Sequence, residues 1–205
     1  MRATTLLSRA AGLIGLLVPI WAQAHTGADA GAHHGLGFVE GLVHPFTGFD
    51  HLAAMLAVGA WSALVMRGRQ VWTAPLAFAA TLLAGAVLGA AGVAVPAVEP
   101  MIAASLLVLG LLVATRRALA PALGAALVAG FALFHGVAHG TELAASASMA
   151  AALAGMVSGT VALHLAGVGL GRLMQSRSVW LTRIAGAGVA VLGMTLLVPA
   201  VAQVL

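Results

Sequence analysis

The feature that most constrains the fold is a series of long apolar segments that fills most of the chain. Breaks at charged residues, proline and glycine divide it into six segments: about 46–66, 72–94, 98–115, 121–141, 148–171 and 179–203. A helix rises about 1.5 Å per residue and the hydrocarbon core of a bilayer is about 30 Å thick, so each segment is long enough to cross it. We therefore expect an all-α, polytopic membrane helix bundle of six transmembrane helices over 46–205.

The composition excludes a soluble domain. Of the 205 residues, 62% are hydrophobic and only 7% are charged, whereas a soluble domain is about a quarter charged. The lipid bilayer is therefore the expected partner. All nine basic residues are arginines scattered in short loops, so no basic patch indicates nucleic acid binding. The chain has no cysteine, and a bound metal would need nitrogen and oxygen ligands.

The N-terminus has the pattern of a secretory signal peptide. Arg2 and Arg9 flank a short apolar stretch, 10–20, and the small-residue cleavage pattern Ala22-Gln23-Ala24 follows. About eleven apolar residues are too few to span a bilayer, which argues against the alternative of an uncleaved anchoring helix. We expect 1–24 to be a cleaved signal peptide, followed by a histidine-containing periplasmic leader and entry segment, 25–45.

The arginines predict the orientation of the bundle. They lie in three alternate connections: Arg67 and Arg69, then Arg116 and Arg117, then Arg172, Arg177 and Arg183. By the positive-inside rule these connections face the cytoplasm. Both mature termini would then face the periplasm, and the protein would be a multi-pass protein of the bacterial inner membrane. Three glycine pairs with G-x-x-x-G spacing predict close helix packing: Gly85 with Gly89, Gly155 with Gly159, and Gly167 with Gly171. A homo-oligomer is an open option.

Ionisable residues interrupt the apolar spans in three places. They are His44, Asp50 and His51 at the first span, His135, His139 and Glu142 in the fourth, and His164 in the fifth. Polar groups at membrane depth are expensive and usually have a function. His51 and His135 lie about 24 Å and 27 Å along the helix from their nearest arginine connection, and His164 about 12 Å. The first two should therefore share the outer half of the membrane, with His164 deeper.

The residue types indicate a transition metal. His135 and His139 are four residues apart, which places both imidazoles on one helix face, where they can bind one ion. Pro45 is expected in the first turn of the first span, and Gly48 permits a local bend there. His25 would become the mature N-terminus, where a free amine and an imidazole can chelate a divalent ion. Histidine and carboxylate ligands suit Ni, Co or Zn, and disfavour Cu(I), Mg and Ca.

At these positions the sequence resembles the HupE/UreJ family. The family motif H-P-x-x-G-x-D-H is matched over 44–51, the motif F-H-G-x-A-H-G-x-E over 134–142, and a Leu-His pattern by Leu163 and His164. The resemblance covers essentially the whole mature chain. It implies a hydrogenase or urease accessory membrane protein that takes up nickel, or in some members cobalt, with six membrane helices and a periplasmic N-terminus. It also implies metal contact or translocation roles for the matched histidines and Asp50.

These observations predict a permease rather than an enzyme, with no prosthetic group. The metal would be captured by His44, Asp50 and His51, pass to His135 and His139, and continue past His164, while Glu142 attracts cations at the surface. No P-loop motif is present, so the chain itself would not hydrolyse ATP in that way. Two alternatives remain: an intramembrane zinc-dependent hydrolase, and a non-transporting metal sensor or accessory subunit.

Overall fold

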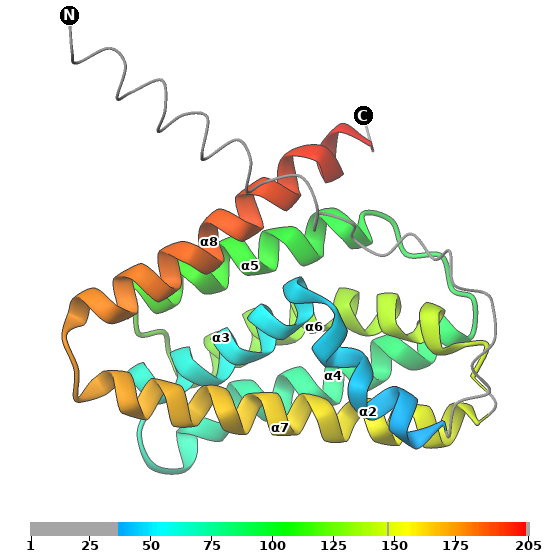
Figure 1. Cartoon of the computed structure of the whole chain (residues 1–205), viewed down its shortest axis with the longest axis horizontal. Coiled ribbons are helices and arrows are strands. Elements are labelled where there is room, and N and C mark those ends of the chain that lie inside the picture. The colour runs from blue at the N-terminus through cyan, green and yellow to red at the C-terminus, as the bar shows by residue number, and fades with distance from the viewer. Residues whose placement is uncertain (1–36, 147, 204–205) are drawn as a thin grey trace, which may run out of the picture. The chain divides into compact units, whose positions relative to one another are not determined.

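The computed structural model describes residues 37–146 and 148–203, whose regular elements are all helical (Figure 1). The expected signal peptide, 1–24, and His25 lie outside the described residues. The elements are α2 (Phe38–Thr47), α3 (Phe49–Val65), the short 3-10 helix η1 (Gly68–Trp72), α4 (Thr73–Ala90), α5 (Val98–Thr115), α6 (Pro121–Leu143), α7 (Met149–Gln175) and α8 (Val179–Ala202).

The expected multi-pass, all-helical architecture is confirmed. Five helices are long and apolar enough to cross a membrane: 68–90, Val98–Thr115, Pro121–Leu143, Met149–Gln175 and Val179–Ala202. Helices α2 and α3 pass the same test only as a pair, and the chain bends by 85° between them. The described residues therefore provide five spans, or six if this broken pair counts as one.

The start of the first span differs from the expectation. We expected a single helix from about 46 with Pro45 in its first turn, but Pro45 lies near the end of α2, inside a helix that begins at Phe38. The reason is tertiary packing: α2 lies along α7, and Gly41 of α2 is buried against the backbone of Ala152. That contact stabilises a helix in a segment that the sequence predicts to be a leader and entry segment, and the break falls at Gly48, whose backbone is extended.

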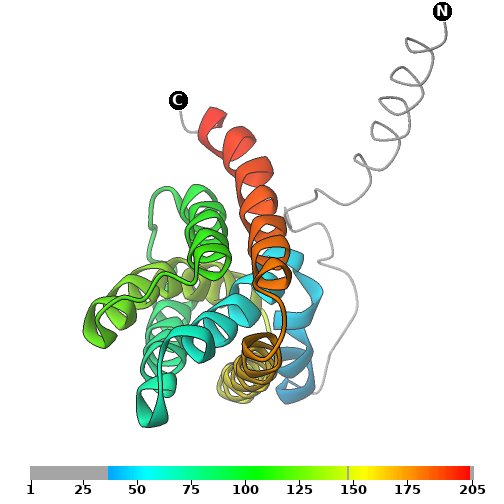
Figure 2. The ribbon, with the colours of Figure 1, turned by 90° about the vertical axis from the view of Figure 1, so that its left-hand side faces the viewer.

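Helix α3 lies at the centre of the bundle. It packs against α7 and α5, and its side chains Met55, Val58 and Trp61 are completely buried. Around it, α4 pairs with α6, α5 with α8, and α2 with α7. Figures 1 and 2 show the α5–α8 pair on one side of α3 and α7 with α2 on another. A central α3 places its N-terminal residues, Asp50 and His51, inside the protein instead of against lipid.

The glycine pairs pack helices closely, as their spacing predicts. A Cβ atom at Gly85 of α4 would clash with the carbonyl oxygen of Leu133, and one at Gly136 of α6 with that of Leu82. The other pairs also meet neighbouring backbones: Gly155 and Gly159 meet α2, and Gly167 and Gly171 meet α3. Because no side chain separates them at these glycines, the backbones of α4 and α6 lie in direct contact.

The three arginine-bearing connections gather at one end of the bundle (Figure 1). There the guanidinium of Arg116 donates hydrogen bonds to Thr182 Oγ1 at 3.0 Å and to the carbonyl of Met174 at 3.2 Å, which joins the ends of α5, α7 and α8. The indole of Trp61 donates to the carbonyl of Arg117 at 2.9 Å. The shared location agrees with the positive-inside pattern, and the assignment of this end to the cytoplasm stays a prediction.

Candidate metal site

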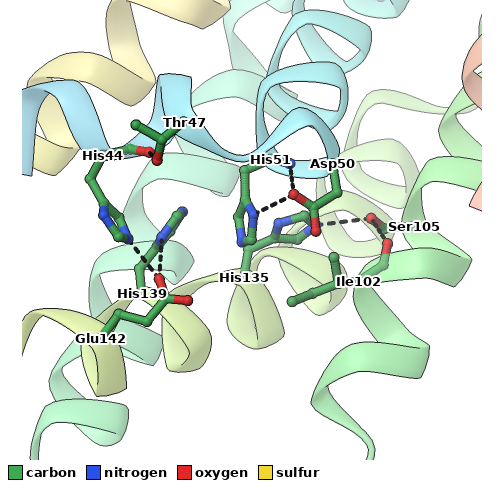
Figure 3. A network of polar contacts seen from close by, with 9 residues as sticks. All are labelled: His44, Thr47, Asp50, His51, Ile102, Ser105, His135, His139 and Glu142. Atoms are coloured by element: carbon green, nitrogen blue, oxygen red, sulfur yellow. Dashed lines mark hydrogen bonds and ion pairs between the residues drawn. The ribbon is translucent and has the colours of Figure 1, made fainter. Parts of the chain in front are cut away.

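Three donor groups converge at the end of the bundle opposite the arginines. His44 of α2 and His139 and Glu142 of α6 each offer a ligand atom, and these atoms lie within 4.8 Å of one another. His44 Nε2 donates to Glu142 Oε2 at 2.7 Å, and His139 Nδ1 lies 3.7 Å from the same oxygen. Figure 3 shows the three side chains pointing toward each other. The break at Gly48 makes this possible, because it turns α2 so that His44 faces α6.

We call His44, His139 and Glu142 the outer group. Two of its side chains are partly exposed and the third is buried. The side chains of His44 and Glu142 are 22% and 34% exposed, whereas that of His139 is 2% exposed. Among residues 37–146 and 148–203, the ion-pair partners of Glu142 and Asp50 are histidines and not arginines. The negative charge at this end is therefore not cancelled by a fixed cation, which favours a divalent ion.

The second group is the pair His51 and His135, whose ring centroids lie 4.8 Å apart. His51 Nδ1 donates a hydrogen bond to Asp50 Oδ1 at 2.9 Å, and the same oxygen accepts the His51 backbone N–H at 2.8 Å. A neutral imidazole that donates from Nδ1 keeps a lone pair on Nε2. Within the described part of the chain, His51 Nε2 is buried without a hydrogen-bond partner. This carboxylate–histidine arrangement is the one that orients ligands in metal sites.

A serine fixes the other ring of this pair. Ser105 of α5 donates its hydroxyl to the carbonyl of Ile102 at 2.6 Å, so its oxygen accepts the hydrogen bond of 2.9 Å from His135 Nε2. The lone pair of His135 then lies on Nδ1, which is buried with no partner among the described residues. Two facing imidazoles thus each keep one unpaired nitrogen lone pair inside the protein. Buried polar atoms are normally satisfied, so these orphaned nitrogens indicate a ligand.

His139 connects the two groups. Its ring centroid lies 4.8 Å from that of His44 and 4.1 Å from that of His51, and neither of its ring nitrogens has a hydrogen-bond partner within 37–146 and 148–203. The order of ring contacts is therefore His44, His139, His51 and His135, which we call the imidazole chain. It leads from the exposed rim at Glu142 into the fully buried position of His135.

His164 of α7 shares an aromatic neighbour with the imidazole chain. It is 2% exposed, and its Nε2 has no partner in the part of the chain that the structure describes. The ring of Phe78 in α4 lies 5.0 Å from His164 and 5.7 Å from His135, centroid to centroid. The expectation that His164 lies deeper in the membrane than the other histidines stays a prediction.

Several of the predicted site residues have neighbours in the structure that the sequence did not predict. We expected His135 and His139 to meet on one face, and the ring of His51 lies against both of them. We expected Glu142 to attract cations at the surface, which stays a prediction, and in the structure its carboxylate accepts a hydrogen bond from His44. We expected Asp50 to contact the metal, and its carboxylate is bonded to His51.

Two residues of the site were missed altogether, Ser105 and Phe78. The only signal for Ser105 was its position as an isolated hydroxyl in an apolar span, and such residues commonly bond to their own helix backbone. Phe78 has no signal in the sequence, because a phenylalanine in a membrane span is an ordinary core residue.

The donor set fits a borderline transition metal. Imidazole nitrogens with carboxylates suit Ni(II), Co(II) and Zn(II), while Ca(II) and Mg(II) require more oxygen ligands. In their neutral forms His51 and His135 each have one ring nitrogen free to bind a metal, and the hydrogen bonds to Asp50 and Ser105 favour the tautomers that leave it free. The geometry of His44, His139 and Glu142 therefore suits a metal ion, and metal contact at His51 and His135, the inner pair, stays a prediction.

Comparisons with known proteins identify the relatives of this chain. Residues 13–196 match the family model of the HupE / UreJ protein. The chain is 41% identical over 187 residues to Protein HupE of Rhizobium leguminosarum bv. viciae, a match that covers 91% of this chain and 95% of that protein. No solved structure matches. The two sequence motifs, the helical bundle and this near full-length match agree, and the chain belongs to the HupE/UreJ family.

Proposed function

We propose that this protein is a permease that takes up a divalent transition metal, nickel first and cobalt next, from the periplasm to the cytoplasm. The observation that carries the proposal is the imidazole chain, which leads from an exposed carboxylate to a buried nitrogen unpaired within the described residues. A purely structural bundle gains nothing from several buried imidazoles without hydrogen-bond partners, because each unpaired polar group costs about 1–3 kcal/mol.

Capture begins at the outer group. Glu142 supplies a negative charge, and His44 and His139 supply nitrogen donors within 4.8 Å of it. Binding breaks the hydrogen bond between His44 and Glu142, and His44 either releases its Nε2 proton to solvent or carries it on Nδ1. The Nε2 lone pair and the Glu142 oxygen that accepted the hydrogen bond then become ligands of the cation. His139, whose two nitrogens lack hydrogen bonds to the described residues, is the member that remains buried and holds the ion at the entrance to the bundle.

Transfer then proceeds by exchange of ligands. His139 lies in ring contact with His51, and His51 with His135. An ion held by His139 can therefore bond to His51 Nε2 before it loses its first ligands, and it is never left without donors in the low-dielectric interior. Asp50 contributes a charge that offsets part of the charge of the ion while it is bound at the inner pair.

The membrane potential can drive this movement. A doubly charged ion that enters a negative interior gains about 4.6 kcal/mol per 100 mV. Since each 1.4 kcal/mol corresponds to a factor of ten, that energy supports a concentration ratio on the order of a thousand. No additional energy source is required for uptake against a moderate gradient.

The proposal is tested by uptake of radiolabelled nickel into liposomes that contain the purified protein. We expect uptake above empty vesicles, a reduction of about tenfold or more in Glu142→Gln since a charged ligand is lost, and normal uptake in Glu40→Gln. Glu40 is a matched control because its carboxylate accepts a hydrogen bond from Ser146 at 3.0 Å and lies outside the donor group. Competition by unlabelled cobalt and zinc ranks the substrates.

The same experiment separates the proposed permease from the sensor alternative. A sensor or accessory subunit would bind nickel with the dependence on Glu142 that we expect, but the liposomes would accumulate no more metal than empty vesicles. That outcome would overturn the permease function and leave the metal site intact. Among the described residues, we find no contact that favours a hydrolase.

A further inference from the structure

Phe78 lies where the imidazole chain ends and the deeper histidine begins. Its side chain is completely buried. Its ring centroid is 5.7 Å from that of His135, on α6, and 5.0 Å from that of His164, on α7. The contact with His164 is edge-on, at 81° between the ring planes. A side chain from a third helix, α4, therefore lies against both histidines at this step of the proposed path.

The face of α4 that carries Phe78 offers no ligand. Residues one turn away on either side, Ala74 and Leu82, are completely buried and apolar. The two histidines that Phe78 contacts, in contrast, do offer ligand atoms. His135 Nδ1 and His164 Nε2 are both buried without partners in the described ranges. A path of unpaired donors is thus interrupted at one position by an apolar ring.

We propose that Phe78 is a hydrophobic gate that closes the path between the imidazole chain and His164. This inference rests on the proposed permease function. A benzene ring has no lone pair to replace a ligand of the ion, and an apolar constriction excludes the water that would otherwise hydrate it. Rotation of the Phe78 side chain opens the step from His135 to His164, and its return closes the path to water and protons.

The gate makes a prediction that ordinary core packing does not. If Phe78 only fills space, shrinking it leaves a dry apolar cavity, because cavities lined by apolar groups stay empty of water. If Phe78 separates two sets of unpaired polar atoms, shrinking it joins them, and water enters from the end of the bundle that carries Glu142. The accessibility of position 164 to a water-soluble reagent distinguishes the two cases.

The chain has no cysteine, so a single introduced thiol reports on one position. We would introduce His164→Cys and treat sealed vesicles, from the side of Glu142, with a charged methanethiosulfonate that does not cross membranes. The thiolate attacks such reagents and displaces a sulfinate, and the thiolate forms where water reaches the sulfur. Two exposed positions serve as references: Ala144→Cys at the Glu142 end and Ala118→Cys at the arginine end. Correctly sided vesicles label the first and spare the second.

With Phe78 present, we expect the thiol introduced by His164→Cys to resist labelling. When Phe78→Ala is added, we expect this thiol to react about tenfold faster or more, because water now solvates the thiolate. Phe78→Leu should give a rate between the two. Equal rates in all three proteins, whether all fast or all slow, would overturn the gate, since closure would then not depend on the size of this side chain.

Two features keep the test decisive. Phe78→Leu keeps most of the buried volume, so the graded comparison survives if Phe78→Ala does not yield a monodisperse protein by size-exclusion chromatography. The labelling is performed without metal, so its result is independent of uptake. If the protein moves no nickel but labelling depends on Phe78, the permease function is refuted and the barrier at Phe78 stands. If the protein moves nickel but labelling does not depend on Phe78, only the gate is refuted.

Discussion

Asp50→Asn is the substitution that tests the inner pair most directly. The carboxylate of Asp50 accepts hydrogen bonds from both the backbone and Nδ1 of His51, at 2.8 and 2.9 Å. Asparagine has the same shape, but it removes the charge and can turn its amide N–H₂ toward the ring. An imidazole that accepts at Nδ1 carries its proton on Nε2. The lone pair that we assign to the metal would then no longer be available.

The size of the effect follows from this indirect role. Partners that orient a ligand without touching the metal typically contribute 10- to 100-fold in metal affinity, which corresponds to about 1.4–2.7 kcal/mol. The side chain of Asp50 is 15% exposed and that of His51 is 10% exposed, so solvent screens this pair only weakly. We expect nickel affinity at the inner pair to fall by that factor, while the protein remains folded.

The measurement is a titration of purified protein with nickel in competition with a chelator of known affinity. Glu40→Gln provides the control for loss of a carboxylate at the same end of the bundle. A double-mutant cycle of Asp50→Asn with His51→Ala identifies the route of the effect. If Asp50 acts through His51, the double variant binds nickel no more weakly than His51→Ala alone, because the two changes are not additive.

Two results would refute this reasoning. Unchanged nickel affinity in Asp50→Asn would show that the hydrogen bond to His51 does not hold a ligand in place. Fully additive losses in the double-mutant cycle would show that Asp50 binds the ion directly, which would return the carboxylate to the role of a ligand.

Two further predictions concern residues that position the site. Ser105→Ala removes the acceptor of the His135 Nε2 hydrogen bond, and we expect a loss of about tenfold in nickel affinity; unchanged affinity in the same titration would contradict the tautomer assigned to His135. Gly136→Ala places a methyl group against the carbonyl of Leu82, whereas Gly130→Ala, on the same helix, meets nothing within 4 Å among the described residues. We expect thermal unfolding in detergent to show a loss of about 1–3 kcal/mol for the first and none for the second, and equal stability of the two would contradict the tight α4–α6 contact.

The sequence by itself determined the class of the fold and singled out the ionisable residues of the candidate site. Apolar segments long enough to cross a bilayer have few other stable solutions, since in lipid every backbone polar group must be bonded within the protein. Polar residues are costly in those segments, so the histidines and Asp50 stood out individually. Their two motifs also indicated the HupE/UreJ family, which the comparisons confirm.

The tertiary structure decided which of these residues meet. Helical periodicity relates residues three or four apart, but it does not fix how one helix is rotated against another. His44 and Glu142 are 98 positions apart in the chain, and they meet because α2 begins early, packs on α7 and turns at Gly48. Ser105 and Phe78 come to lie against His135 in the same way, from helices brought close at α3 and at the glycine contacts of α4 and α6.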